Sequence, residues 1–138
     1  MRIIDFHCDT VSECFVKSRG DIKLKENNCH IDIDKLKSGG ALAQFFAVFV
    51  PSGEQMDHYG MDITGFEFFL LAQKAYEREM SANADVILPA YTAGDIIKNK
   101  QAGKISAVLS IEDGALIEGS LDRIRELHTR GVRLITLT

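Results

Sequence analysis

Four short apolar runs limit what this chain can fold into more than any other feature of its sequence. They cover residues 2–6, 43–50, 105–111 and 132–137. The longest reads Ala-Gln-Phe-Phe-Ala-Val-Phe-Val and stops at Pro51-Ser52-Gly53. Runs of this length that end at turn-forming residues favour strands over helices. Nearly continuous apolarity is typical of strands that are buried on both faces, as in parallel sheets.

Helical patterns separate these runs. Apolar residues recur at helical spacing from residue 64 to about 80, which predicts an amphipathic helix. Thr92 and Ser120 can cap the starts of two further helices, and Gly103 and Gly131 fit their ends. A turn or two of helix is also expected over residues 32–37. The inner face of the helix after Ser120 is expected to consist of Leu121, Ile124 and Leu127.

The alternation of strands and helices indicates an α/β fold with parallel strand pairing. If parallel strands of this kind close into a (β/α)8 barrel, the barrel needs eight strand–helix units, typically about 250 residues. This chain has 138 residues, and its fourth predicted strand ends at Thr138. We therefore expect one domain over residues 1–138, either a small open sheet or a part of something larger.

Composition excludes several classes of function. The chain is 46% hydrophobic and 26% charged with a net charge of −4, as in soluble globular proteins. It has no basic cluster, so we expect no nucleic-acid partner. No apolar run can span a bilayer and no signal peptide opens the sequence, so we expect no membrane partner and a cytoplasmic location. The three cysteines are sparse, and free, mostly buried thiols are expected for Cys8, Cys14 and Cys29.

The first candidate for chemistry is the pair His7 and Asp9, at the carboxyl end of the first predicted strand. In a strand, residues two apart point to the same side, with Cys8 turned away. An imidazole nitrogen and a carboxylate oxygen are good zinc ligands, and α/β proteins place active sites at this end of their strands. The alternative is a His–Asp hydrogen bond that holds a loop.

Glu112 ends the third predicted strand at the same edge of the sheet. Alone, such a carboxylate often marks only the exit of a strand to solvent. Together with His7 and Asp9 it makes three potential ligands that can converge from distant positions in the sequence. Gly114 permits a tight turn after the acid.

Other motifs are weaker. A structural role is expected for His128, near the end of a helix, and surface positions for His30 and His58. The sequence contains no glycine-rich phosphate loop and no GxSxG nucleophile motif.

Four stretches, taken in order, resemble the membrane (renal-type) dipeptidase family of zinc-dependent TIM-barrel hydrolases. They are Asp5-Phe6-His7-Cys8-Asp9-Thr10, Gly39-Gly40-Ala41 with the run that follows, Ser110-Ile111-Glu112-Asp113-Gly114, and Gly131-Val132-Arg133-Leu134-Ile135-Thr136-Leu137-Thr138. Their spacing agrees along nearly the whole chain. The resemblance implies that residues 1–138 are the N-terminal half of a (β/α)8 barrel.

The resemblance also implies a two-zinc site and a dipeptide substrate. His7 and Asp9 would bind one metal, and Glu112, the catalytic candidate, would bridge both. The other ligands and the proton-transfer residue would lie beyond Thr138. Asp113 stands where the family has its first glycine after the glutamate, which leaves the conformation of this loop open.

Two other functions stay open on the sequence alone. One is a related amidohydrolase that acts on another amide or a lactone, and the other is a non-catalytic α/β module. If the family assignment holds, the isolated chain is expected to be inactive and to self-associate through an open sheet edge, and the parent to be an oligomer.

Overall fold

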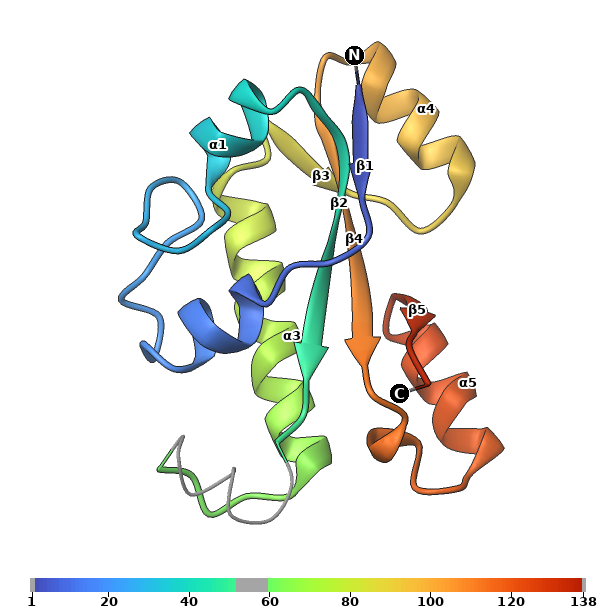
Figure 1. Cartoon of the computed structure of the whole chain (residues 1–138). Coiled ribbons are helices and arrows are strands. Elements are labelled where there is room, and N and C mark those ends of the chain that lie inside the picture. The colour runs from blue at the N-terminus through green and yellow to red at the C-terminus, as the bar shows by residue number, and fades with distance from the viewer. Residues whose placement is uncertain (1, 52–59, 138) are drawn as a thin grey trace.

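The computed structural model describes residues 2–51 and 60–137 and contains one parallel sheet of five strands (Figure 1). The strands are β1 (Ile3–Asp5), β2 (Ala41–Phe49), β3 (Ile87–Pro89), β4 (Ile105–Glu112) and β5 (Val132–Ile135). The helices are η1 (Thr10–Val16), α1 (Ile33–Ser38), α3 (Gly65–Ala82), α4 (Ala93–Gln101), η2 (Ala115–Ile117) and α5 (Leu121–Thr129). The predicted α/β fold with parallel pairing is confirmed.

Strand β4 is the centre of the sheet. It pairs with β2 along residues 106–112, and on its other edge β3 pairs with its first residues and β5 with its last. β1 pairs with β2 on the outside. Since every pairing is parallel, the carboxyl ends of β1, β2 and β4 lie at one end of the sheet. The candidate ligands follow or end two of these strands.

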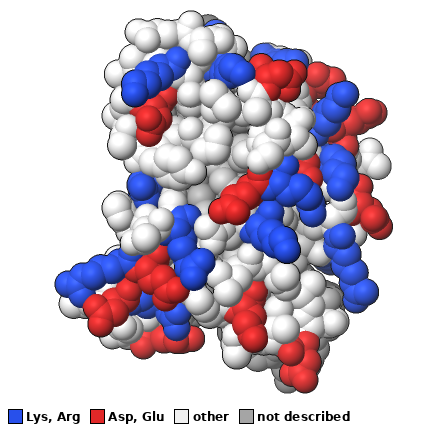
Figure 2. Space-filling model, turned by 180° about the vertical axis from the view of Figure 1, so that it is seen from behind, with Lys and Arg blue, Asp and Glu red and all other residues white. Residues whose placement is uncertain are grey.

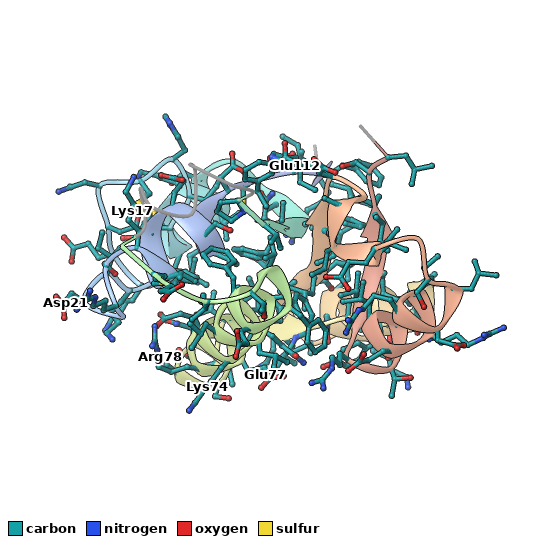
Figure 3. All side chains as sticks on the ribbon, turned by 90° about the horizontal axis from the view of Figure 1, so that it is seen from below. Lys17, Asp21, Lys74, Glu77, Arg78 and Glu112 are labelled. Atoms are coloured by element: carbon teal, nitrogen blue, oxygen red, sulfur yellow. A yellow bond between two sulfur atoms is a disulfide. The ribbon has the colours of Figure 1, made fainter. Side chains whose placement is uncertain are left out.

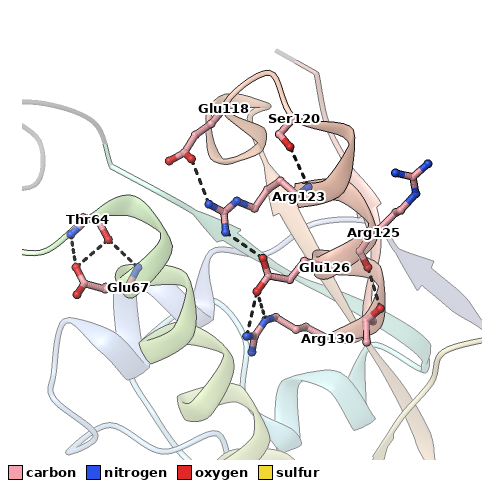
Figure 4. A network of polar contacts seen from close by, with 9 residues as sticks. Thr64, Glu67, Glu118, Ser120, Arg123, Arg125, Glu126 and Arg130 are labelled. Atoms are coloured by element: carbon pink, nitrogen blue, oxygen red, sulfur yellow. Dashed lines mark hydrogen bonds and ion pairs between the residues drawn. The ribbon is translucent and has the colours of Figure 1, made fainter.

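The helix starts follow the capping residues in the sequence. Thr64 Oγ1 accepts a hydrogen bond from the backbone N–H of Glu67, whose side chain accepts one in return from the Thr64 N–H (Figure 4). Thr92 makes the same capping box with Asp95, and Ser120 caps α5. The predicted helices are therefore confirmed, because side chains satisfy the backbone donors that each first turn leaves unpaired.

The core lies between the sheet and α3, which runs alongside β2, to the left of the strands in Figure 1. Phe46 and Val48 of β2 are fully buried, as are Phe68 and Phe69 of α3. All of β4 except Glu112 is buried, as expected for a central strand covered on both faces. β1 differs: its Ile3 and Ile4 are exposed, and Phe6 stacks on Phe45 while remaining 59% exposed. Self-association through this region stays a prediction.

The short strand β3 was not predicted. It has only three residues and ends in Pro89, a residue that is uncommon inside sheets. It pairs with residues 105–107 of β4, so the sheet has five strands instead of four.

The expected inner face of α5 was wrong at two positions. Leu127 is buried, but Leu121 is 70% exposed and Ile124 is 37% exposed. The helix contacts α3 through a cation instead, because the Arg123 guanidinium lies 4.0 Å from the centre of the Phe66 ring. Glu118 and Glu126 hold that guanidinium in place (Figure 4).

The expectation of free thiols was wrong for Cys14 and Cys29, which form a disulfide with Cα atoms 6.8 Å apart. Their separation of 15 residues carries no signal for pairing. The tertiary structure brings the end of η1 against the loop before α1. Cys8 is free and buried, as expected. No helix in the described ranges is long and apolar enough to cross a membrane.

Candidate metal centre

Three potential metal ligands meet at the carboxyl end of the sheet. His7 Nε2 lies 3.3 Å from Asp9 Oδ1 and 3.6 Å from Glu112 Oε2. One potential ligand atom from each of the three residues lies within 4.8 Å of the other two. The structure therefore brings together the three residues that the sequence singled out. Their roles as ligands stay a prediction.

The reason for the convergence of His7 and Asp9 differs from the predicted one. β1 ends at Asp5, so both residues belong to the segment that follows the strand. Asp5 Oδ1 accepts the backbone N–H of His7 at 3.1 Å, and the Cys8 carbonyl accepts the N–H of Ala47 at 2.9 Å. Cys8 points into the core as predicted. Specific hydrogen bonds, rather than strand alternation, hold this segment.

Gln44 is a supporting residue that the sequence reasoning missed. It is buried in β2, and its Nε2 donates to the His7 carbonyl at 3.1 Å and to the Phe45 carbonyl at 3.0 Å. A buried amide needs such partners. Gln44 is the one polar residue in the apolar run 43–50, and that exception was the available signal.

Glu112 lies in an electrostatic environment that a cation would relieve. Partial burial raises the pKa of its carboxyl, and the neighbouring Asp9 carboxylate raises it further, while His7 lowers it. The ligand atoms of Asp9 and Glu112 lie within 4.8 Å of each other, and two ionised carboxylates this close repel unless a positive charge lies between them. One imidazole nitrogen with two carboxylate oxygens is a donor set that zinc accepts, so the residues fit a metal ion.

The turn after Glu112 depends on Asp113, which takes the place expected for Gly114. Asp113 has φ 73°, whereas Gly114 has φ −84°, which any residue can adopt. The Asp113 side chain accepts the Ala115 N–H at 2.7 Å, and its own N–H donates to Thr136 Oγ1 at 3.0 Å. The aspartate thus stabilises locally a conformation that a glycine adopts freely.

We expect Asp113→Ala to lower the free energy of unfolding by about 1–3 kcal/mol, because it keeps the left-handed backbone and loses a hydrogen bond. Asp113→Gly loses the same hydrogen bond, but glycine adopts a positive φ without steric strain. The glycine variant should therefore be clearly more stable than the alanine variant. Urea unfolding of both variants is the measurement. Equal stability of the two would show that the backbone at residue 113 is not strained.

His30 and His128 are not members of this cluster. His30 is exposed and lines a cleft of about 610 Å³ together with His7, Asp9 and the Cys14–Cys29 disulfide. His128 lies in the last turn of α5, as expected. His58 lies outside the described residues.

The sequence matches the family described as membrane dipeptidase (peptidase family M19) over residues 1–138. Among curated proteins it is 30% identical over 108 residues to dipeptidase ataJ of Aspergillus terreus. It is also 30% identical over 115 residues to dipeptidase tcpJ of Claviceps purpurea. These alignments cover 77% and 78% of this chain but 26% of each relative, so the chain spans about a quarter of their length.

Solved structures show the same fold. The dipeptidase AC, a metallopeptidase of family M19, superposes with a TM-score of 0.79 at 22% identity, over 98% of this chain and 43% of that one. A metallopeptidase from Rhodobacter sphaeroides, solved with a phosphinate mimic of the dipeptide L-Ala-D-Ala, superposes with a TM-score of 0.79 at 22% identity. That match covers 98% of this chain and 44% of the other. The sheet and helices described above therefore correspond to a part of that fold.

Proposed function

This chain belongs to the membrane dipeptidase family, peptidase family M19, and on that premise we propose that it supplies part of the zinc centre of a dipeptidase. The observation that carries the proposal is the approach of His7, Asp9 and Glu112 to within 4.8 Å at the carboxyl end of a parallel sheet. Metallopeptidase is the function at family level; zinc, dipeptide substrates and a (β/α)8 barrel for the whole protein are the proposed parts.

Each residue has a distinct task in this proposal. His7 would hold a metal ion through Nε2, and Asp9 would hold the same ion through a carboxylate oxygen. Glu112 would bridge this metal and a second one, a role that requires the carboxylate to be ionised. Zinc, when bound, would lower the pKa of a coordinated water to near neutrality and polarise the scissile carbonyl. Gln44 and Asp5 keep the His7 backbone in place, so that the imidazole is oriented before metal binds.

A two-metal centre needs more ligands than these three. Over the described ranges, His7, Asp9 and Glu112 form the one group of three or more such side chains close enough to share an ion. We propose that segments outside residues 1–138 complete the centre. The chain by itself is then expected to show no turnover of L-Ala-D-Ala with added zinc, and measurable hydrolysis would contradict this expectation.

Metal analysis of His7→Ala tests the proposal in the most direct way. The variant, made in the complete protein and purified without chelators, should contain less zinc than the wild type and should have lost dipeptide hydrolysis. His128→Ala is the matched control, because it removes an exposed histidine from the far end of α5. Equal zinc content in wild type and His7→Ala would remove His7 as a ligand. Tight zinc without hydrolysis of dipeptides would instead point to another amide or a lactone as substrate.

A further inference from the structure

A groove separate from the metal centre lies between the end of η1 and the outer face of α3. Its volume is about 560 Å³, within the range of small-molecule sites. Phe15, Met61, Ile63 and Leu71 contribute apolar surface to it. In Figure 3, Lys74 and Arg78 at this groove lie on the opposite side of the molecule from Glu112. The groove therefore has no part in the chemistry proposed above.

Three cations, Arg19, Lys74 and Arg78, also line this apolar groove. Lys74 and Arg78 are four residues apart on α3 and share one face of the helix, where like charges repel. Among the described residues, no Asp or Glu lines the groove, although the buried Glu79 pairs with Arg78 from behind it. Figure 2 shows the molecule from behind, where Lys and Arg side chains alternate with Asp and Glu side chains over the surface.

The position of Arg78 is set by a buried carboxylate. Glu79 is 1% exposed, and its Oε1 accepts from Arg78 Nε and lies 3.0 Å from Arg78 Nη2. Glu79 Oε2 accepts the backbone N–H of Leu24 at 2.8 Å. These contacts do not use Arg78 Nη1, which lies 2.7 Å from the place that a Cβ on Gly20 would take. The glycine thus leaves room for the guanidinium at the wall of the groove.

The groove has a charged end and an apolar end. Arg78 lies in the C-terminal half of α3 and meets Gly20, so that Arg19, Gly20 and Arg78 are together at one end. Met61 and Ile63 precede the first residue of α3, so they line the other end. Leu71 lies on the stretch of helix between the two ends, and its large apolar side chain is 45% exposed.

We propose that this groove binds a single-chain amphiphilic carboxylate, such as a medium-chain fatty acid. The carboxylate would lie between Arg19 and Arg78, where guanidinium groups can hold it by paired hydrogen bonds, and Lys74 would add charge. The acyl chain would run along Leu71 toward Met61 and Ile63 and remove their surface from water. A volume of about 560 Å³ suits one chain better than a two-chain lipid.

Methyl NMR of the complete protein with dodecanoate, below its micelle concentration, tests this proposal at individual residues. We expect shifts at the methyl groups of Met61 and Leu71 and saturable binding. Lys74→Glu should weaken the affinity by about tenfold or more, because it replaces an attraction by a repulsion. Lys100→Glu makes the same charge reversal at an exposed position of α4 and should not change the affinity. His7→Ala should not change it either.

Several outcomes would overturn the proposal. One is unchanged affinity in Lys74→Glu, provided that its thermal unfolding matches the wild type; if the reversal disturbs folding, Lys74→Gln replaces it and should weaken binding less. Another is binding of the cation dodecyltrimethylammonium with the same affinity as dodecanoate, which would show that only the apolar chain is recognised. Shifts centred on the exposed side of β1 would move the site elsewhere. Binding of an acidic amphipathic peptide without any response to dodecanoate would assign the groove to a protein partner.

Discussion

Glu112→Gln is expected to abolish hydrolysis by the complete protein while leaving the metal-free fold at least as stable as the wild type at neutral pH. The amide keeps the shape of the side chain but cannot supply the negative charge that a bridging ligand needs. Loss of a proposed direct metal ligand should cost more than the 10- to 100-fold typical of residues that only support a ligand, so we expect a loss of about 10³-fold or more.

The stability part of this prediction follows from the pKa of Glu112, which is raised in the folded chain by partial burial and by Asp9. A carboxyl whose folded pKa lies above its unfolded pKa adds stability below the unfolded pKa. That contribution is lost as the pH rises through the folded pKa. At neutral pH the ionised Glu112 is therefore unfavourable in the absence of metal, and the neutral glutamine removes this effect.

A dipeptide hydrolysis assay of the complete protein measures the first part, and urea unfolding with and without zinc, at pH values from 4 to 8, measures the second. Glu26→Gln is the matched control, because Glu26 is exposed and lies in the loop before α1. Wild type should gain stability from zinc and the Glu112 variant should not. A zinc-dependent gain that survives in Glu112→Gln would contradict the bridging role. A variant that is less stable than wild type without metal would show that Glu112 has a structural role instead.

The second large effect is expected from the disulfide between Cys14 and Cys29. A crosslink over 15 residues should stabilise the fold by about 3 kcal/mol, chiefly by restricting the unfolded chain. The free energy of unfolding of a native domain is typically about 5–15 kcal/mol, so the disulfide would supply a substantial part of this stability. We therefore expect reduction to lower the urea midpoint strongly.

The measurement compares urea unfolding with and without reductant in the wild type and in Cys14→Ala/Cys29→Ser. The double variant should resemble the reduced wild type and should not respond to reductant. Cys8→Ala is the control for the thiol that remains, and it should keep the response. A midpoint that does not change on reduction would contradict the crosslink. Since disulfides are rare in reducing compartments, the outcome also bears on the expected cytoplasmic location, which stays a prediction.

Much of the fold could be predicted because its signals are local. Thr64, Thr92 and Ser120 cap helices in the structure as in the sequence, since a side-chain oxygen next to the first turn satisfies that turn wherever it occurs. Strand β3 could not be predicted, because three residues that end in Pro89 become a strand only where β4 offers them an edge.

The residues of the candidate site could also be predicted, but the contacts that hold them in place could not. His7, Asp9 and Glu112 could be chosen because they follow or end apolar strands. Gln44 donates a hydrogen bond to the His7 carbonyl, 37 positions away, and Thr136 Oγ1 accepts one from the Asp113 N–H, 23 positions away. Nothing in local spacing indicates such partners.

The sequence by itself determined the longer strands, the capped helices and the side chains that could bind a metal, but not the short elements η1 and β3. Apolar runs, capping residues and side-chain chemistry act over a few neighbouring positions, so these properties can be inferred without a fold. The tertiary structure alone decided the disulfide, the left-handed turn at Asp113 and the cationic groove along α3. Each of these depends on the approach of groups from separate elements, and the free energy of packing the whole chain determines which groups approach.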